Sequence, residues 1–296
     1  MLLAAHIKIT ALAIAVAASP MAATVLDAPV RPETVATVTA PELVKLKAGS
    51  VRYSGAGEFI QDGKPVDAPT PALKRAPPLS IMKYQVTQRD YRRCAADGGC
   101  PPLATASPNG ADLPAVMVSW RDAEAYARWL SGKLGANYRL PTDEEWTFAA
   151  ASRAPGELPA LRGDSDPVKR WLARYEREIE GKPVNAKPMP LGSFGVNENG
   201  LADLAGNVWE WTSTCFTRSV LTDSGPRVVT TNCGVRVAEG RHRAFVTDFI
   251  RDARGGGCAS GVPPANLGFR LVRDDDTALS WLDKIWRIAA ARLERI

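Results

Sequence analysis

The sequence predicts a loop-rich α+β domain. Three observations support this class: the chain has 24 glycines and 23 prolines among 296 residues, two segments carry clear helix-start signals, and several short runs alternate like strands. So many turn-forming residues argue against a helical bundle. With 45% apolar and 23% charged residues, the chain is long enough and apolar enough to bury a large core.

Two helices are predicted from their N-cap residues. Ser119 caps a helix that runs from Trp120 to about Leu134. Its inward face follows three- and four-residue spacing at Trp120, Ala123, Ala127 and Leu130. Thr142 and Glu145 form a capping box, in which each side chain meets the backbone N–H of the other residue.

Shorter elements are predicted around these helices. Thr87 is expected to cap a short helix that ends near Cys94. Strand-like runs lie at 43–47, 49–53, 80–86 and 208–212. From Pro188 onward the pattern predicts loops and short strands. The charged stretch from about Pro167 to Ile179 is expected to be an inserted surface helix.

The charge pattern excludes one class of partner. The formal net charge is +5, and removal of the N-terminal segment with Lys8 lowers it only slightly. Lysines and arginines alternate with acids and form no long basic run. We therefore expect no nucleic-acid binding.

The first 23 residues are typical of a secretory signal. Lys8 precedes an apolar stretch from Ile9 to Ala18, and small residues follow up to Ala23. The apolar stretch is too short to span a bilayer, although an uncleaved anchor remains an alternative. Residues 24–42 are expected to form a linker. We expect a periplasmic or secreted protein with no transmembrane span after cleavage.

Five cysteines therefore belong in an oxidising compartment. Cys94 and Cys100 flank a short flexible loop that a disulfide can close, and Cys215 and Cys233 offer a second pair. Cys258 is left without a partner. The alternative is metal ligation, but no Cys-x-x-Cys pair is present and histidine is scarce, which disfavours zinc.

The last residues, 275–296, are expected to form a C-terminal amphipathic helix. Its apolar side follows helical spacing at Leu279, Leu282, Ile285, Trp286, Ala289 and Leu293. Such a stripe is typical of a core or interface helix. The domain itself is expected to occupy residues 43–274.

Four segments, in order, resemble the formylglycine-generating enzyme family, also called sulfatase-modifying factors. They are Ile81–Thr87, Arg139–Trp146, Asn199–Thr212 and Asn266–Arg270. The third segment, with two tryptophans among a dozen ordered positions, is the most specific. The resemblance implies the loop-rich α+β fold of this family, which is related to C-type lectins.

The resemblance also implies a structural calcium ion. The matching positions are Asp203 and Glu210 by side chain, and Gly206 and Val208 by backbone oxygen. Calcium prefers many oxygen ligands of these kinds. The alternative is that the two carboxylates only cap turns.

Copper is not expected. The oxidases of the family bind copper(I) through two cysteines five positions apart, and the corresponding positions here fall near Arg241 and Val246. Neither side chain suits a soft monovalent ion. Formylglycine formation by the copper route is therefore not expected of this chain.

The same stretch carries many charged side chains instead. One hypothesis is an acid–base or anion-binding pocket in which His242, Arg241 and Asp248 are the catalytic residues. The alternative is an ion-paired strand at the surface.

Two functions remain open from the sequence. The first is an exported enzyme that modifies a protein or peptide-like substrate without copper cysteines. The second is a non-catalytic binding or accessory module on the same scaffold. The sequence leaves open whether the substrate is a protein, a peptide or a small molecule, and whether the protein is catalytic.

Overall fold

The computed structural model describes residues 38–66, 68–69, 71–104, 110–155, 169, 187–255 and 266–274. They all belong to one compact unit that begins at Val38. Several predicted features lie outside the described residues: the signal at 1–23, the linker before residue 38, nearly all of the helix at 167–179, Cys258 and the C-terminal helix. Within the described residues, no helix is long and apolar enough to cross a membrane.

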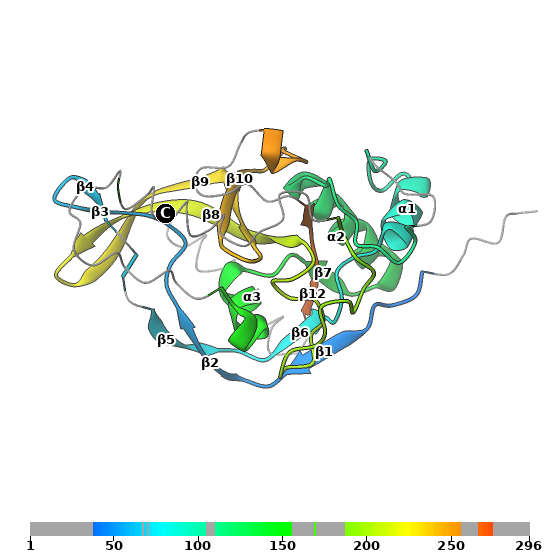
Figure 1. Ribbon diagram of the computed structural model, residues 1–296, viewed down its shortest axis with the longest axis horizontal. Helices are drawn as coiled ribbons and strands as arrows, with labels where there is room; N and C mark the ends of the chain where they lie inside the picture. Colours follow the sequence, from blue (N-terminus) through cyan, green and yellow to red (C-terminus); the bar gives the residue numbers. More distant parts are fainter. Residues whose placement is uncertain are drawn as a thin grey trace, which may run out of the picture. The chain divides into compact units, whose positions relative to one another are not determined.

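Two larger sheets and one ribbon build the domain (Figure 1). The first sheet has the order β1-β6-β12-β7, and its strands are β1 (Leu43–Leu46), β6 (Leu79–Met82), β12 (Val272–Asp274) and β7 (Asn137–Arg139). This sheet therefore combines strands from the beginning, the middle and the end of the domain's sequence. A separate two-stranded ribbon pairs β2 (Gly49–Tyr53) with β5 (Ala72–Ala76).

The second sheet is organised by one long hairpin. Its strands, in the order β10-β9-β8-β3-β4, are β10 (Ala244–Thr247), β9 (Gly225–Glu239), β8 (Trp209–Thr222), β3 (Gly57–Gln61) and β4 (Lys64–Val66). The short strand β11 (Leu267–Gly268) adds to β8 in parallel. The prediction of short strands after Pro188 is wrong for this region. Interruptions of the β8–β9 register near Cys215 and Arg218 break the alternation that would have marked long strands.

The three helices are confirmed where their caps predicted them. They are α1 (Gln88–Ala96), α2 (Trp120–Leu134) and α3 (Asp143–Ala150), with short 3₁₀ turns at Ala151–Arg153 and Ala253–Gly255. Thr87, Ser119 and Thr142 each accept a backbone N–H as N-cap, and the last two form complete capping boxes. Local side-chain to backbone bonds of this kind fix helix starts independently of the rest of the fold.

Both predicted disulfides are present. Cys94 and Cys100 lie 5.3 Å apart between Cα atoms and close the turn after α1. Cys215 and Cys233 lie 4.5 Å apart and connect β8 to β9 across the irregular part of their ladder. The second bond therefore holds the hairpin where its backbone pairing is interrupted.

Helix α3 packs between the ribbon and the hairpin sheet, with contacts to β2, β8 and β9 (Figure 1). Its Trp146 is fully buried and donates its indole N–H to the Glu210 carboxylate at 2.9 Å. Trp211 is also fully buried and donates to the carbonyl of Val118 at 2.8 Å. A buried indole needs such an acceptor.

The Glu210 carboxylate meets a second, stronger partner in Arg270. Both side chains have no exposed surface, and the guanidinium grips both carboxylate oxygens at 2.6 and 2.7 Å. Its remaining N–H groups donate to the backbone carbonyls of Met82, Lys83 and Ala202. All five N–H donors of the guanidinium are thus used, and one side chain joins β6, β8 and the turn before Asp203.

Arg270→Met is expected to destabilise the domain by about 3 to 5 kcal/mol, because it leaves a buried carboxylate without its cation. Urea unfolding followed by tryptophan fluorescence measures this change. The matched control is Arg218→Met, which breaks an exposed pair with Glu58 and should cost less than about 1 kcal/mol. Equal losses of unfolding free energy in the two variants would contradict the buried pairing of Arg270 with Glu210 as a main source of stability.

Candidate functional site

The positions that the sequence singled out lie on and around β10. Arg241 and His242 precede this strand, Val246 is within it, and Asp248 follows it. Arg241 is exposed, whereas Val246 is completely buried. The three predicted catalytic residues are therefore close in sequence, but Arg241 and His242 lie at one end of β10 and Asp248 lies at the other.

His242 packs against an aromatic side chain. Its ring lies edge-on to Trp209, with 5.4 Å between ring centroids, and Trp209 donates its indole N–H to the His242 carbonyl. The Nδ1 atom lies 3.1 Å from the carbonyl oxygen of Arg243. A carbonyl accepts only, so Nδ1 carries the proton in the neutral ring and Nε2 is the acceptor. The imidazole, in the segment just before β10, is therefore held in one tautomer.

Asp248 is held at the other end of β10 by a helix. Arg121, near the start of α2, grips its carboxylate through Nε at 2.9 Å and Nη2 at 3.3 Å. The backbone of Arg121 also donates to the Asp248 carbonyl. Because the four residues of β10 span roughly 13 Å, the structure does not bring Asp248 together with His242. The roles of Arg241, His242 and Asp248 stay a prediction.

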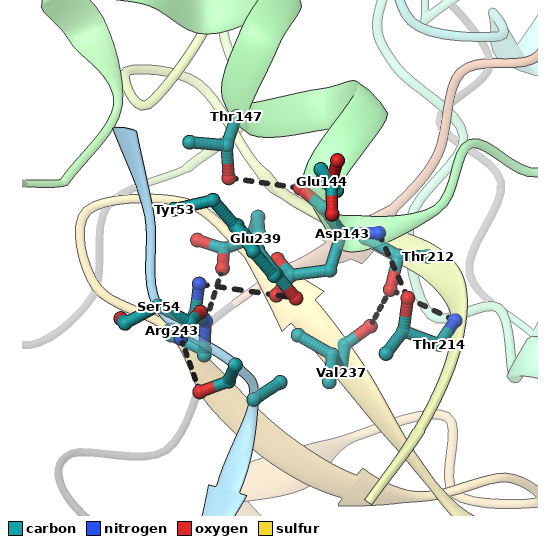
Figure 2. Close-up of polar contacts among 12 residues, drawn as sticks. Tyr53, Ser54, Asp143, Glu144, Thr147, Thr212, Thr214, Val237, Glu239 and Arg243 are labelled. Carbon is teal, nitrogen blue, oxygen red and sulfur yellow. Dashed lines mark hydrogen bonds and ion pairs between the residues drawn. The ribbon is translucent and has the colours of Figure 1, made fainter. Parts of the chain in front are cut away.

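Arg243, between these residues, reaches into a buried polar cluster that the sequence did not predict (Figure 2). Its guanidinium lies 3.0 Å from Asp143 and 2.7 Å from Glu239. Tyr53 donates its hydroxyl to the same Asp143 carboxylate at 2.8 Å. Both carboxyl groups are buried, with 0% and 1% of each residue exposed.

Four separate elements supply this cluster. Tyr53 ends β2, Asp143 begins α3, Glu239 ends β9, and Arg243 precedes β10. The backbone N–H of Asp143 donates in turn to the Thr214 hydroxyl. Asp143 looked in the sequence like an ordinary acidic residue in a helix first turn. Only the charge density around Glu239 and Arg243 hinted at its partners.

A cavity of about 460 Å³ opens beside this cluster, between the β2–β5 ribbon and α3. Tyr53, Phe148 and Leu79 contribute to its wall, and the Lys74–Glu144 ion pair, at 2.8 Å, lies beside them. The charged side chains that line it are thus held by partners of their own. Both apolar and charged side chains line the cavity, and neither sign of charge dominates it.

A third arrangement lies where β9 passes α2. The Arg236 guanidinium stacks 3.8 Å above the Trp120 ring and donates to the Ser213 carbonyl. Burial lowers the pKa of Arg236. Stacking on an aromatic face is a common way to hold a partly buried guanidinium.

The residues of the implied calcium site meet donors instead of a free space for a cation. Asp203 accepts the backbone N–H groups of Gly192 and Phe194. Each oxygen of Glu210 accepts two donors, from Arg270 together with either Gln85 or Trp146. Calcium needs lone pairs from these carboxylates. As arranged here, the Glu210 side chain has both oxygens fully used by donors, and calcium binding through Asp203, Glu210 and the backbone of Gly206 and Val208 stays a prediction of the resemblance.

The domain is a loop-rich α+β fold built around the long β8–β9 hairpin and the buried Arg270. Comparison with protein families assigns it further: the model of the sulfatase-modifying factor enzyme 1-like domain matches residues 29–275. The match covers most of the chain. The chain therefore belongs to the sulfatase-modifying factor family, which confirms the resemblance found in the sequence.

Some curated relatives are named as inactive proteins and others as formylglycine-generating enzymes. The bovine inactive C-alpha-formylglycine-generating enzyme 2 is 35% identical over 170 residues, which are 53% of this chain and 54% of that protein. The formylglycine-generating enzyme of Streptomyces coelicolor is 33% identical over 174 residues, 55% of this chain and 53% of that protein. The chain thus spans about half the length of the curated relatives it matches.

Among solved structures, PvdO from Pseudomonas aeruginosa is similar to this chain, with a TM-score of 0.48 and 24% identity. The alignment covers 79% of this chain and 94% of PvdO.

Removal of calcium is expected to leave the melting temperature unchanged, because the carboxylates of Asp203 and Glu210 already have donors. Differential scanning fluorimetry with excess chelator, and then with added Ca²⁺ or Mg²⁺, measures this. A fall of several degrees that Ca²⁺ alone restores would show that the side chains rearrange around a bound ion.

Proposed function

We propose that this chain is an exported, copper-independent member of its family whose β9–β10 face binds a protein or peptide-like ligand. The observation that carries the proposal is the pair of positions that match the copper cysteines. Arg241 presents a cation and Val246 is a buried hydrocarbon. Neither offers the thiolate that copper(I) requires.

The cysteines elsewhere support the same conclusion. All four that fall within the described residues form disulfides, and a disulfide sulfur is not a thiolate. Cys258 lies outside the described residues and supplies only a single sulfur. A two-cysteine copper site would need a second one.

The charged side chains around β10 favour binding over chemistry. Asp248 is committed to Arg121, and Arg243 to Asp143 and Glu239. The side chains left at the surface, Arg241 and the 61% exposed Phe249, suit recognition of a partner. The bovine relative is itself named as inactive, which is compatible with a non-catalytic role for this chain.

The second candidate is modification of the same class of ligand by acid–base chemistry. The observation in its favour is the single tautomer of His242, whose Nδ1 is fixed by the Arg243 carbonyl. In a neutral imidazole held this way, Nε2 is the atom that accepts a proton. This atom is buried, so the candidate requires the turn that carries His242 to move when the ligand binds. In this case, a peptide extract treated with the protein should show a mass change that His242→Gln abolishes.

Export is part of the proposal. Two disulfides suit an oxidising compartment, and the N-terminal 23 residues have the composition of a secretory signal. Fractionation of the producing cells tests it. Recovery of the full-length chain in the cytoplasm, with reduced cysteines, would overturn this part.

Incubation with copper(I), oxygen and a sulfatase-type cysteine peptide is expected to yield no aldehyde, because the chain lacks the thiolate pair. Mass spectrometry after aldehyde capture measures the product, and a formylglycine-generating enzyme from a relative serves as the positive control. Cys258→Ser should behave like the wild type. Aldehyde formation by the wild type would overturn the proposed function.

A further inference from the structure

Asp143 and Glu239 form a buried acidic pair that the proposed function does not use. The first residue of α3 and the last residue of β9 bring their carboxyl groups together, although 96 positions separate them in sequence. The same guanidinium, that of Arg243, contacts both carboxyl groups. Both side chains are shielded from bulk solvent, since 0% and 1% of the two residues are exposed.

The positive charge at this pair is too small for two carboxylates. Arg243 is the cation that contacts them, and it uses one oxygen of each: Oδ2 of Asp143 at 3.0 Å and Oε1 of Glu239 at 2.7 Å. Tyr53 donates to the Asp143 oxygen that Arg243 already holds. The opposite oxygens, Oδ1 of Asp143 and Oε2 of Glu239, are buried and have no donor.

Other charged groups around the pair are already neutralised. Glu144, the next residue of α3, pairs with Lys74 of β5. Glu210, opposite Glu239 in the β8–β9 ladder, pairs with Arg270. His242, on the Arg243 turn, packs against Trp209. Among the ion pairs of the described residues, Arg243 is the cation that contacts the acidic pair.

We propose that Asp143 and Glu239 share one proton between their two unpartnered oxygens and so form a pH-sensitive clamp. The clamp holds the turn of Arg241 and His242 against β2 and α3 through Arg243 (Figure 2). With the proton in place, the cluster contains one carboxylate, one carboxylic acid and one guanidinium. It is then electrically neutral, and both oxygens are satisfied.

The direction of the pH dependence follows from burial. Burial first, and the neighbouring Asp143 charge second, raise the pKa of Glu239 well above its ordinary range. The folded chain therefore keeps a proton that the unfolded chain releases above about pH 4.3. Stability from this pair is complete at acid pH and is lost as the pH rises through the raised pKa.

The test compares the pH dependence of the melting temperature in three forms of the full chain: wild type, Glu239→Gln and Glu144→Gln. The amide introduced by Glu239→Gln can donate permanently where the shared proton lies, so the wild-type decline above about pH 5 should become clearly shallower. Above neutral pH this variant should melt higher than the wild type. Glu144→Gln, which changes the adjacent, partly exposed acid, should keep the wild-type slope.

Parallel profiles for the wild type and Glu239→Gln would overturn the clamp. If Glu239→Gln does not fold, Asp143→Asn places the same donor on the other side of the pair and should flatten the profile equally. Infrared spectroscopy of the wild type gives an independent measurement. The carbonyl stretch of a protonated carboxylic acid should persist at neutral pH, and its absence there would also overturn the proposal.

Discussion

Arg270 is the side chain on which the rest of the domain depends. It lies in a short segment near the end of the described chain, yet its five N–H groups reach Glu210 and three backbone carbonyls from distant parts of the sequence. Buried charge of this kind is costly unless every donor and acceptor is satisfied. Here the satisfied network fixes where β6, β8 and the Asp203 turn meet, and Trp146 of α3 adds to the same carboxylate.

This network positions the hairpin sheet. The hairpin in turn positions the candidate site, which lies where the chain leaves β9. Glu210 lies near the start of β8, directly opposite Glu239 at the end of β9. Beyond Glu239 the chain turns toward β10, and Arg243, just before that strand, returns to Asp143. The surface that carries Arg241 and Phe249 is therefore tied to the core by two successive charged networks.

The sequence predicted what depends on neighbours in the chain. Ser119 and Thr142 define helix starts through bonds to residues three positions away, so α2 and α3 were found at their observed N-termini. The short loop between Cys94 and Cys100 predicted their disulfide for the same reason. Four ordered segments identified the family, and its fold came with that identification.

Contacts between distant positions were not predictable in this way. The pairing of Glu210 with Arg270, and of Asp143 and Glu239 with Arg243, depends on chain topology, which no local pattern encodes. The length of β8 and β9 was missed because bulges near Cys215 and Arg218 disturb the alternation. His242 and Asp248, close in sequence, are separated because an extended strand carries them apart.

We propose that this family member works without a copper thiolate centre. Titration of the reduced and the oxidised protein with copper(I), in competition with a chromophoric chelator, tests it most directly. The protein with intact disulfides is expected to take no copper from the chelator, and Cys258→Ser is expected to behave identically. Tight binding of one copper(I) per chain by the disulfide-bonded wild type would contradict it.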